Sequence, residues 1–511
     1  RAKGYLIFHL NLAFSSVEEE SQKDIIQACY YPLLNLIKET RVPIGIELTG
    51  WTLDKINQID SNWIALFKEL LNSGGCEIIG SGYSQIIGPL VPFQVNEWNQ
   101  RLGLEYYEKI LGQKPDIAYV NEMVFSRSMV DLYSQFDYKA IIIDSDNTKL
   151  ALNSHELPSH AEGIHNSTIQ ILWSDSILFQ KMQHYAHGDI SINDYQEYLK
   201  GRVQKGELLL PIYCNDAEIF DYRPGRFSEE RSTHHEGEWK RINKLLNTIS
   251  SEKTIEFISP TEALECNNIS KNVSKIVNAN YPIPVKKQNK YNIARWAVTG
   301  KDDLWLNTMC HLIQENFTKC KNQNSDDWRS LCELWSSDLR THITDTRWKN
   351  AKSKLNKLII KHNINEQLET HHKSIPNYVS LEDINTMCKE VDVSLINDDI
   401  LLHISTKYLE LDLNLRRGSA IQKLAFLSHG MKPCIGTIQH GYFESISLGA
   451  DYYSGNSIIE LPLLRKKVTD LEVVKPKFIF KNNKIIEIHN EIETEFGVIK
   501  KIVTINTDSE K

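Results

Sequence analysis

Short apolar runs alternate with longer amphipathic stretches through the first half of the chain. Seven of these runs have the length and apolar content of buried strands, and apolar residues recur at helical spacing between several of them. The expected strands cover residues 5–12, 42–48, 76–80, 117–120, 140–144, 168–173 and 208–213, and the expected helices include 22–40, 61–73, 95–111, 126–136 and 194–205. This alternation predicts βαβ units and a parallel sheet.

Seven such repeats fall within residues 1–266, and a closed or nearly closed α/β barrel takes about 250 residues. A doubly wound open sheet has the same periodicity, so the pattern alone leaves both architectures open. In either one, polar residues that follow parallel strands meet at one edge of the sheet.

The pattern changes after the last of these repeats. Residues 267–292 are polar and contain the segment YPIPV, which is typical of a connection between domains. Residues 293–396 begin with apolar and Trp residues at helical spacing, and residues 397–511 alternate apolar and polar positions between Gly and Asn. We therefore expect a catalytic barrel, a connection, a helical domain and a C-terminal antiparallel β-domain of the sandwich type.

Composition narrows the class of protein. The chain has 511 residues, of which 41% are hydrophobic and 24% charged, and these are the values of an ordinary globular protein with two or three domains. The net charge of −8 and the lack of a basic tract argue against nucleic acid and anionic membrane as partners. Nine scattered cysteines without a CxxC pair, and an N-terminus without a signal-peptide pattern, predict a cytoplasmic protein with reduced thiols. Homo-oligomerisation is left open.

Polar side chains follow each expected strand. They are His9 and Asn11, Glu47, Tyr83 and Gln85, Glu122, Asp144 and Asp146, Asp175, and Asp216 with Glu218. In a barrel these side chains converge on the mouth where catalysis is carried. Carboxylates and amides bind sugar hydroxyls, while Tyr and Trp rings stack on the apolar side of a sugar, so the set predicts a carbohydrate site.

Glu122 and Asp216 are the two acids of most chemical interest, because each ends an apolar run on a separate strand. A pair of carboxylates about 5–6 Å apart can cleave a glycosidic bond with retention, one as nucleophile and one as acid/base. Any single strand-end acid is more often a helix N-cap or a loop ion pair. Asp175, which precedes Ser176 and an expected helix, fits that structural role.

The sequence offers weaker signals for other chemistry. His184 and His187 have the spacing of metal ligands but lack a third ligand nearby, so we expect neither a metal nor another cofactor. His234 could bind a sugar hydroxyl or be exposed. The glycines Gly80 and Gly82 lack the surrounding pattern of a nucleotide-binding loop.

Five segments together resemble glycoside hydrolase family 57, the group of retaining α-amylases and 4-α-glucanotransferases. The segments are FHLNLAF (8–14), ELTGWTLDKI (47–56), CEIIGSGYSQIIGPLVP (76–92), YVNE (119–122) and NDAEIF (215–220). The chain departs from the family where Leu10 and Asn11 follow His9 in place of Gln-Pro, and where Gln85 occupies a position at which His is common.

The resemblance implies an incomplete (β/α)7 barrel, followed by a helical domain and an antiparallel β-domain. It also implies a retaining hydrolase or transglycosylase for α-linked oligo- or polysaccharides, with Glu122 as nucleophile and Asp216 as acid/base. The expected substrate-binding residues are His9, Asn11, Glu47, Tyr83, Gln85, Asp175, Glu218 and His234. Two alternatives stay open: a carbohydrate-binding protein with a decayed active site, and a metal-dependent polysaccharide deacetylase on a related barrel.

Overall fold

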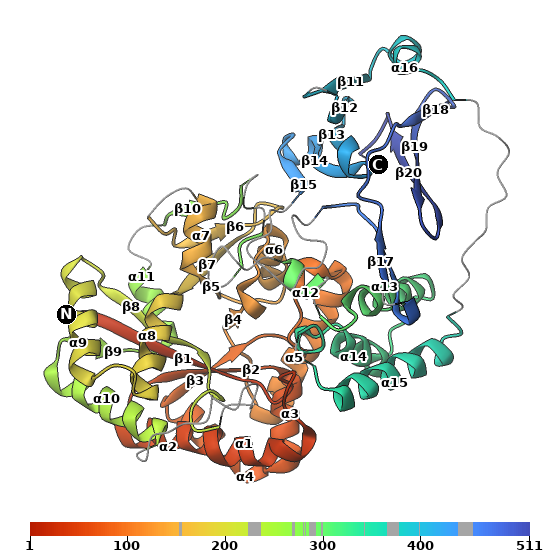
Figure 1. Ribbon diagram of the computed structural model, residues 1–511. Coiled ribbons are helices and arrows are strands. Elements are labelled where there is room, and N and C mark those ends of the chain that lie inside the picture. The colour runs from red at the N-terminus through yellow and green to blue at the C-terminus, as the bar shows by residue number, and fades with distance from the viewer. Residues whose placement is uncertain are drawn as a thin grey trace. The chain divides into compact units, whose positions relative to one another are not determined.

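The chain forms two compact units, Arg1–Val277 with Ile283–Asn365, and Asn278–Pro282 with Glu366–Lys511. The computed structural model (Figure 1) describes residues 1–511 except 153–155, 223–236, 268–270, 279–280, 282, 286–292, 298–299, 342, 365–377, 398, 438–452, 465 and 511. The barrel and the helical region share the first unit, and the C-terminal β-region forms the second. The domain boundaries expected at 266, 292 and 396 stay predictions.

Seven parallel strands form the main sheet of the first unit, as the apolar runs predicted. They are β1 (Ala2–Leu10), β2 (Ile44–Leu48), β3 (Cys76–Gly80), β4 (Ile117–Tyr119), β5 (Ala140–Asp144), β7 (Thr168–Ser174) and β8 (Leu209–Asp216), in the spatial order β7-β5-β4-β3-β2-β1-β8. Three short strands extend the sheet: β6 (His160–Glu162) antiparallel to β7, β9 (Ile255–Phe257) beside β1, and β10 (Val273–Ser274) beside β6.

The sheet is curled into an incomplete barrel, and this excludes the doubly wound alternative. The Tyr5 hydroxyl of β1 donates to the carbonyl of Trp173 in β7, although four strands separate β1 from β7 in the sheet. One buried cluster draws on six strands, with Tyr5, Ile7, Ile79, Ile117, Tyr119, Ala140, Ile142, Leu172 and Cys214. Such an interior core requires the sheet to close around it. Within the described residues, no strand pairing joins β8 to β7.

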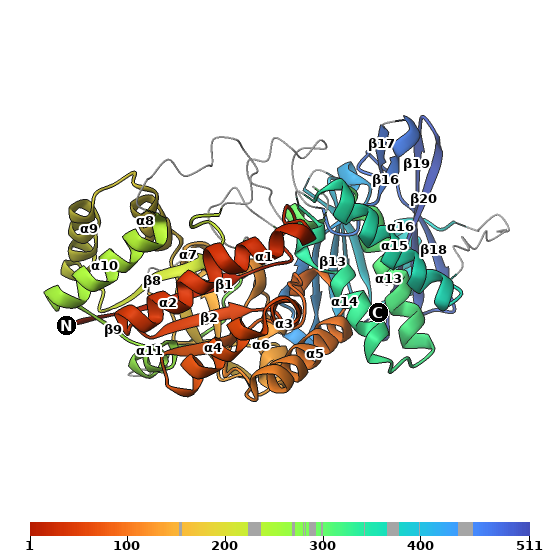
Figure 2. The same cartoon turned by 90° about the horizontal axis from the view of Figure 1, so that it is seen from below.

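Helices cover the outside of this sheet (Figures 1 and 2). They are α1 (Gln22–Ile25), a π-helical turn (Ile26–Tyr30), α2 (Tyr31–Thr40), α3 (Gly50–Ile59), α4 (Ser61–Asn72), α5 (Phe93–Leu111), α6 (Arg127–Gln135), α7 (Ser145–Leu152), α8 (Ser176–His187), α9 (Ile192–Gln204), α10 (Glu238–Glu252) and α11 (Pro260–Asn267). Alternate residues of β1 and β2 face these helices: Leu6, Phe8 and Leu10, and Ile44, Ile46 and Leu48, all within the outer core. The residues between them therefore face the barrel interior.

The helical region packs beside the loops that follow β3. It contains α12 (Ala294–Ala297), α13 (Asp303–Lys319), α14 (Ser325–Leu334), a short 3-10 turn (Ser337–Leu339) and α15 (Asp345–Lys361). Trp98 of α5 stacks on Trp328 of α14 with ring centroids 5.3 Å apart. The Ser337 amide donates to the Gln85 carbonyl at 2.7 Å, which fixes the 3-10 turn against the barrel mouth.

The second unit is an antiparallel β-structure, as expected from the alternating pattern. Its strands are β11 (Asp392–Ile396), β12 (Leu401–Ser405), β13 (Leu409–Asn414), β14 (Ala420–Phe426) and β15 (Pro433–Gly436), then β16 (Ile458–Leu461) with β17 (Lys466–Thr469), and β18 (Lys477–Lys481), β19 (Ile485–Thr494) and β20 (Gly497–Asn506). A short helix, α16 (Leu381–Met387), precedes them. The five-stranded and three-stranded sheets share one buried core, as in a sandwich.

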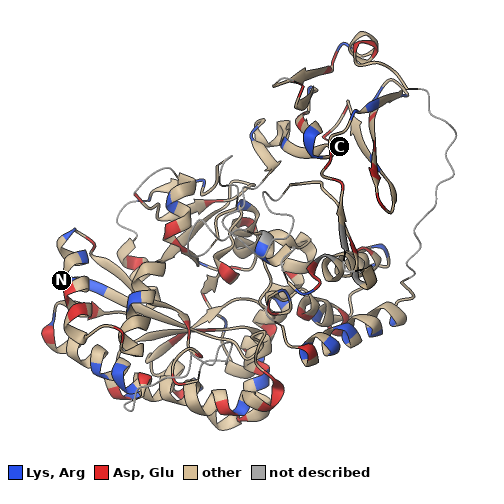
Figure 3. Cartoon of the chain, viewed as in Figure 1, with Lys and Arg blue, Asp and Glu red and all other residues tan. Residues whose placement is uncertain are grey.

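Charge is spread over the outer helices of the first unit (Figure 3). Acidic and basic residues both occur on most of them, and basic residues predominate on α15. In the part of the chain that the structure describes, none of the helices has the length and apolar character needed to cross a bilayer.

Candidate functional site

Three polar residues meet where β1, β2 and β8 end. His9 lies opposite Glu47 of β2 and opposite Asp216 of β8 in the strand register. Leu10 faces the outer helices and Ile7 faces the interior, so strand alternation directs His9 inward. The sequence predicted each of these three side chains at a strand end, and the parallel register brings them to one level of the barrel.

His9 is held in place from two sides. Its Nδ1 contacts the Glu47 carboxylate, which is fully buried, and its ring stacks on Tyr119 with centroids 5.6 Å apart and planes 14° from parallel. A ring fixed by a carboxylate on one nitrogen presents its other nitrogen in a defined direction. That second nitrogen, Nε2, lies 4.0 Å from Asp216 Oδ1.

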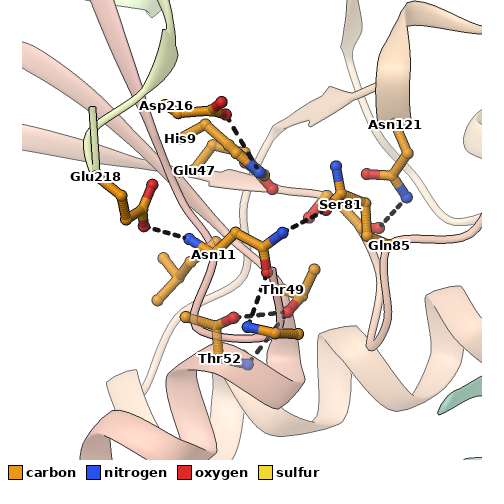
Figure 4. A network of polar contacts seen from close by, with 12 residues as sticks. His9, Asn11, Glu47, Thr49, Thr52, Ser81, Gln85, Asn121, Asp216 and Glu218 are labelled. Carbon is orange, nitrogen blue, oxygen red and sulfur yellow. Dashed lines mark hydrogen bonds and ion pairs between the residues drawn. The ribbon is translucent and has the colours of Figure 1, made fainter. Parts of the chain in front are cut away.

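Asp216 is the exposed member of this group (Figure 4). Its side chain is 40% exposed, whereas that of His9 is 4% exposed. The Ala217 amide donates to the His9 carbonyl at 2.8 Å, and the Tyr213 hydroxyl donates to the Asp216 carbonyl at 2.7 Å. These two bonds fix the backbone at position 216 and leave the carboxylate accessible to a ligand.

Glu122 lies in a 3-10 turn, Asn121–Met123, directly after β4, and is half-buried. It has a left-handed backbone with φ of 53°, and Met123 follows with φ of 56°. Each non-glycine residue in this region costs about 1–2 kcal/mol, and such strain concentrates at functional sites. The side-chain amide of Asn121 donates to the carbonyls of Ser81 and Ile86 at 3.3 and 3.2 Å, which anchors the turn to the loop after β3.

Tyr119 connects the two acids electrostatically. Burial raises the pKa of this phenol well above its usual value, and the charges of Cys214, Asp216 and Glu122 raise it further. Both acids therefore act on one side chain of the barrel interior. The convergence of Glu122 and Asp216 on one pocket stays a prediction.

Glu218 is a second carboxyl beside Asp216, and it is buried. Its Oε1 accepts hydrogen bonds from the Asn11 amide at 2.7 Å and from the Tyr30 hydroxyl at 2.5 Å. Burial, together with the nearby charge of Asp216, raises the pKa of Glu218 to about 7. The protonated form is thus accessible near neutral pH.

Asn11 links this barrel edge to the helical region. Its side-chain amide donates to Gln85 Oε1 at 2.8 Å, and its backbone amide donates to Glu218 (Figure 4). The side-chain amide also donates to Asp338 Oδ1 at 2.9 Å. Asn11, Gln85 and Asp338 are each 5–6% exposed. Asn11 and Gln85, the two positions at which this chain departs from the family pattern, are therefore bonded to each other.

Asp338 was missed in the sequence. Burial raises the pKa of this carboxyl to about 6, against the lowering effects of Arg347, Asn11 and Ser336, and the charge of Glu122 adds a smaller increase. It stands in the segment LWSSDLR between two helical stretches, and a polar break beside a Trp is the only signal that could have pointed to it. Its contact with Asn11 spans 327 residues, which a single sequence does not reveal.

The other predicted residues have different surroundings. Tyr83 is buried, and its hydroxyl donates to Glu333 at 3.3 Å. Asp175 caps α8, where Oδ1 accepts from the amides of Ile177 and Leu178 and Oδ2 pairs with Arg202 at 2.7 Å. His234 lies outside the described residues. Substrate binding by these three residues stays a prediction.

The described residues contain no group of three His, Cys, Asp or Glu side chains that could hold a metal ion. His184 and His187, which have metal-ligand spacing in the sequence, contact the carboxylates of Asp189 and Glu238 at 2.8 and 2.5 Å. Each thus has a carboxylate partner of its own.

Comparison with known proteins agrees with this architecture. The profile of glycosyl hydrolase family 57 matches residues 10–278. A 4-α-glucanotransferase from Thermococcus litoralis is 12% identical with a TM-score of 0.56, over 99% of this chain and 84% of the other. An α-amylase from Thermotoga maritima is 13% identical with a TM-score of 0.52, over 73% and 95%.

A GH57-type branching enzyme from Pyrococcus horikoshii is 12% identical with a TM-score of 0.51, over 74% of this chain and 99% of the other. A search of curated protein sequences finds no match. At these identities the solved structures establish the shared fold, and the family is established by a profile that matches more than half of the sequence. The chain belongs to glycosyl hydrolase family 57, a family of enzymes that hydrolyse or transfer glycosidic bonds.

Proposed function

We propose that this enzyme acts on α-linked oligo- or polysaccharides by double displacement, with Glu122 as nucleophile and Asp216 as acid/base. Glu122 attacks the anomeric carbon while Asp216 protonates the departing oxygen, and a second displacement passes the glycosyl group to water or to a sugar hydroxyl. The observation that carries the proposal is the accessible Asp216 carboxylate facing His9, whose ring stacks on Tyr119, with Glu122 within electrostatic range of the same Tyr119.

The surrounding residues suit this division of roles. His9, fixed by Glu47 and Tyr119, presents Nε2 towards Asp216, where this nitrogen can bind a sugar hydroxyl. Glu218, whose pKa is raised to about 7, places a second carboxyl next to Asp216. Because that pKa lies near neutrality, Glu218 can hold a proton beside the proposed acid/base.

The α-linked substrate follows from family membership and is supported by the similar structures, which are a glucanotransferase, an amylase and a branching enzyme. Hydrolysis and transfer use the same two carboxylates. Incubation with defined α-linked oligosaccharides, with products separated by size, distinguishes them, because transfer yields chains longer than the substrate.

Covalent trapping tests the nucleophile. A mechanism-based α-glycosyl fluoride inhibitor should attach to Glu122, and peptide mass spectrometry should locate the adduct there. The Glu122→Gln protein should remain unlabelled, whereas Asp216→Asn should still be labelled by this activated reagent. An adduct on another carboxylate, or a folded protein that is never labelled, would reject the assigned role.

A further inference from the structure

A cleft of about 510 Å³ opens beside the Asn11 contacts, between the barrel mouth and the helical region. Its barrel wall comes from the loops that follow β1, β2 and β3 and from the first turns of α3. Its other wall comes from α14, the 3-10 turn and α15. Glu122, Asp216 and His9 do not line it, so the space is separate from the predicted catalytic acids.

The cleft wall combines an aromatic ring with hydrogen-bonding groups. Trp51, at the start of α3, is partly exposed there, and Lys55 lies 5.7 Å from its ring centroid and 3.5 Å from Glu19. Gln22 also lines the cleft and is 5% exposed, and its Oε1 has no hydrogen-bond partner among the described residues. A buried acceptor without a partner costs about 1–3 kcal/mol, which a ligand hydroxyl would recover.

The charges around the cleft favour an uncharged ligand. Six carboxylates line it, and three cations accompany them: Lys55, Lys354 and Arg347. Lys55 and Lys354 already pair with acids of the cleft, and Arg347 lies within electrostatic range of Asp338 and Glu18. An anionic sugar would meet a net negative wall without an available cation.

The inner end of the cleft reaches the contacts of Asn11. Gln85 and Asp338 line the cleft, and both accept hydrogen bonds from the Asn11 side chain. The backbone amide of Asn11 bonds Glu218, which lies beside Asp216. A sugar chain that extends from the proposed catalytic acids past Asn11 would enter the cleft.

We infer that the cleft is a binding subsite for the flanking sugars of a neutral, extended α-linked oligosaccharide, with Trp51 as its stacking platform. The inference rests on the proposed function and adds to it a preference for longer chains. Short oligosaccharides would contact the catalytic acids alone, and longer ones would also cover Trp51 and reach Gln22.

Binding to the Glu122→Gln protein, measured by calorimetry, tests the inference without turnover of the ligand. The probes are maltose and maltoheptaose, and a charged oligogalacturonide serves as the anionic comparison. Maltoheptaose should bind about tenfold or more tightly than maltose, and Trp51→Ala in the same background should remove most of that advantage. Maltose affinity should change by less than about twofold, and the oligogalacturonide should not bind.

A matched pair of substitutions on α15 tests the cleft without changing Trp51, so the result does not depend on whether Trp51→Ala disturbs folding. Asn350 lines the cleft and Asn356 does not, and both are exposed on this helix. Asn350→Arg should weaken maltoheptaose binding, whereas Asn356→Arg should leave it unchanged.

Equal affinity for both chain lengths, or a length advantage that survives both Trp51→Ala and Asn350→Arg, would overturn the inference and leave the proposed reaction intact. A second outcome combines two results: length-dependent binding is lost in both variants, and the wild-type protein has no activity. That outcome would support the subsite and reject the proposed reaction. Absence of binding to either probe would overturn the subsite.

Discussion

The ends of β5 and β7 carry acids at the same barrel edge as the ends of β1 and β8, yet the two groups have different surroundings. Asp144 is buried and accepts from Ser176 and Asp146, and Asp175 caps α8 and pairs with Arg202. Asp216 is 40% exposed and faces His9 at 4.0 Å. A position at a strand end is therefore not enough to identify a candidate catalytic acid. The groups that its carboxylate oxygens contact must also be considered.

The largest expected effect comes from removing the proposed acid/base. Asp216→Asn should reduce turnover by about 10³-fold, because acid–base catalysis contributes roughly 10²–10⁴-fold. The melting temperature should change little, since the side chain is accessible. Steady-state kinetics on an α-linked oligosaccharide and thermal unfolding measure the two effects.

Azide provides the control for that variant. With Asp216→Ala, azide should intercept the glycosyl-enzyme and restore activity with a product of retained configuration, because azide needs no general base. Near-wild-type turnover of Asp216→Asn would contradict the distinction between the two groups of strand-end acids.

Asp144 should contribute to the pH dependence of stability. Burial raises its pKa from 3.8 to about 7, so folding favours the protonated carboxyl. Its stabilising contribution is complete below about pH 4 and is lost as the pH rises through 7, an effect of about 4 kcal/mol. Asp144→Asn keeps partners for Ser176 and Asp146 and should lose less stability across this range, because only Glu218 and Asp338 among these three buried carboxyls with a raised pKa still titrate. Urea unfolding of both proteins from pH 4.5 to 8 measures the difference, and parallel curves would contradict the expectation.

Asp175 should show a purely structural effect. Asp175→Ala removes the cap of α8 and the pair with Arg202, and it should lower the free energy of unfolding by about 2–3 kcal/mol. Asp175→Asn retains the cap and should lose less, because Asn is an equally good N-cap residue. Turnover per folded molecule should stay within about twofold in both variants. A large loss of turnover with unchanged stability would instead assign Asp175 to the substrate.

The smallest effect is expected at Tyr30. Its hydroxyl bonds Glu218, and this bond lowers the pKa of that carboxyl. Tyr30→Phe should therefore raise the pKa of Glu218 above about 7 and move one limb of the pH–rate profile to higher pH. The loss of one hydrogen bond, about 1 kcal/mol, should reduce turnover by about fivefold. A profile that does not move would show that Glu218 does not titrate during turnover.

The strands were predictable because apolar runs bounded by polar residues have few alternative explanations. The predicted strand at 76–80 is observed at those positions, and His9, Glu47 and Asp216 fall together because parallel strands align their carboxyl ends. Helix α3 was missed, since it begins directly after β2 without a polar loop, at Gly50.

Contacts between distant segments were not predictable. Asp338 reaches Asn11 only because the Ser337 amide bonds Gln85 and holds the 3-10 turn at the barrel mouth. The cap role of Asp175 was anticipated from the following Ser176, but its pair with Arg202 depends on how α9 packs. Side-chain chemistry at a site thus follows from tertiary packing that local periodicity does not encode.

The bond between the Asn11 backbone and Glu218 has a consequence for how this enzyme can diversify. Every residue except proline, which the family commonly has here, carries that amide, so an exchange of Asn11 for any other residue leaves the anchor of Glu218 in place. Natural or designed variation can therefore retune what the sugar meets at this point while the neighbouring acid keeps its orientation.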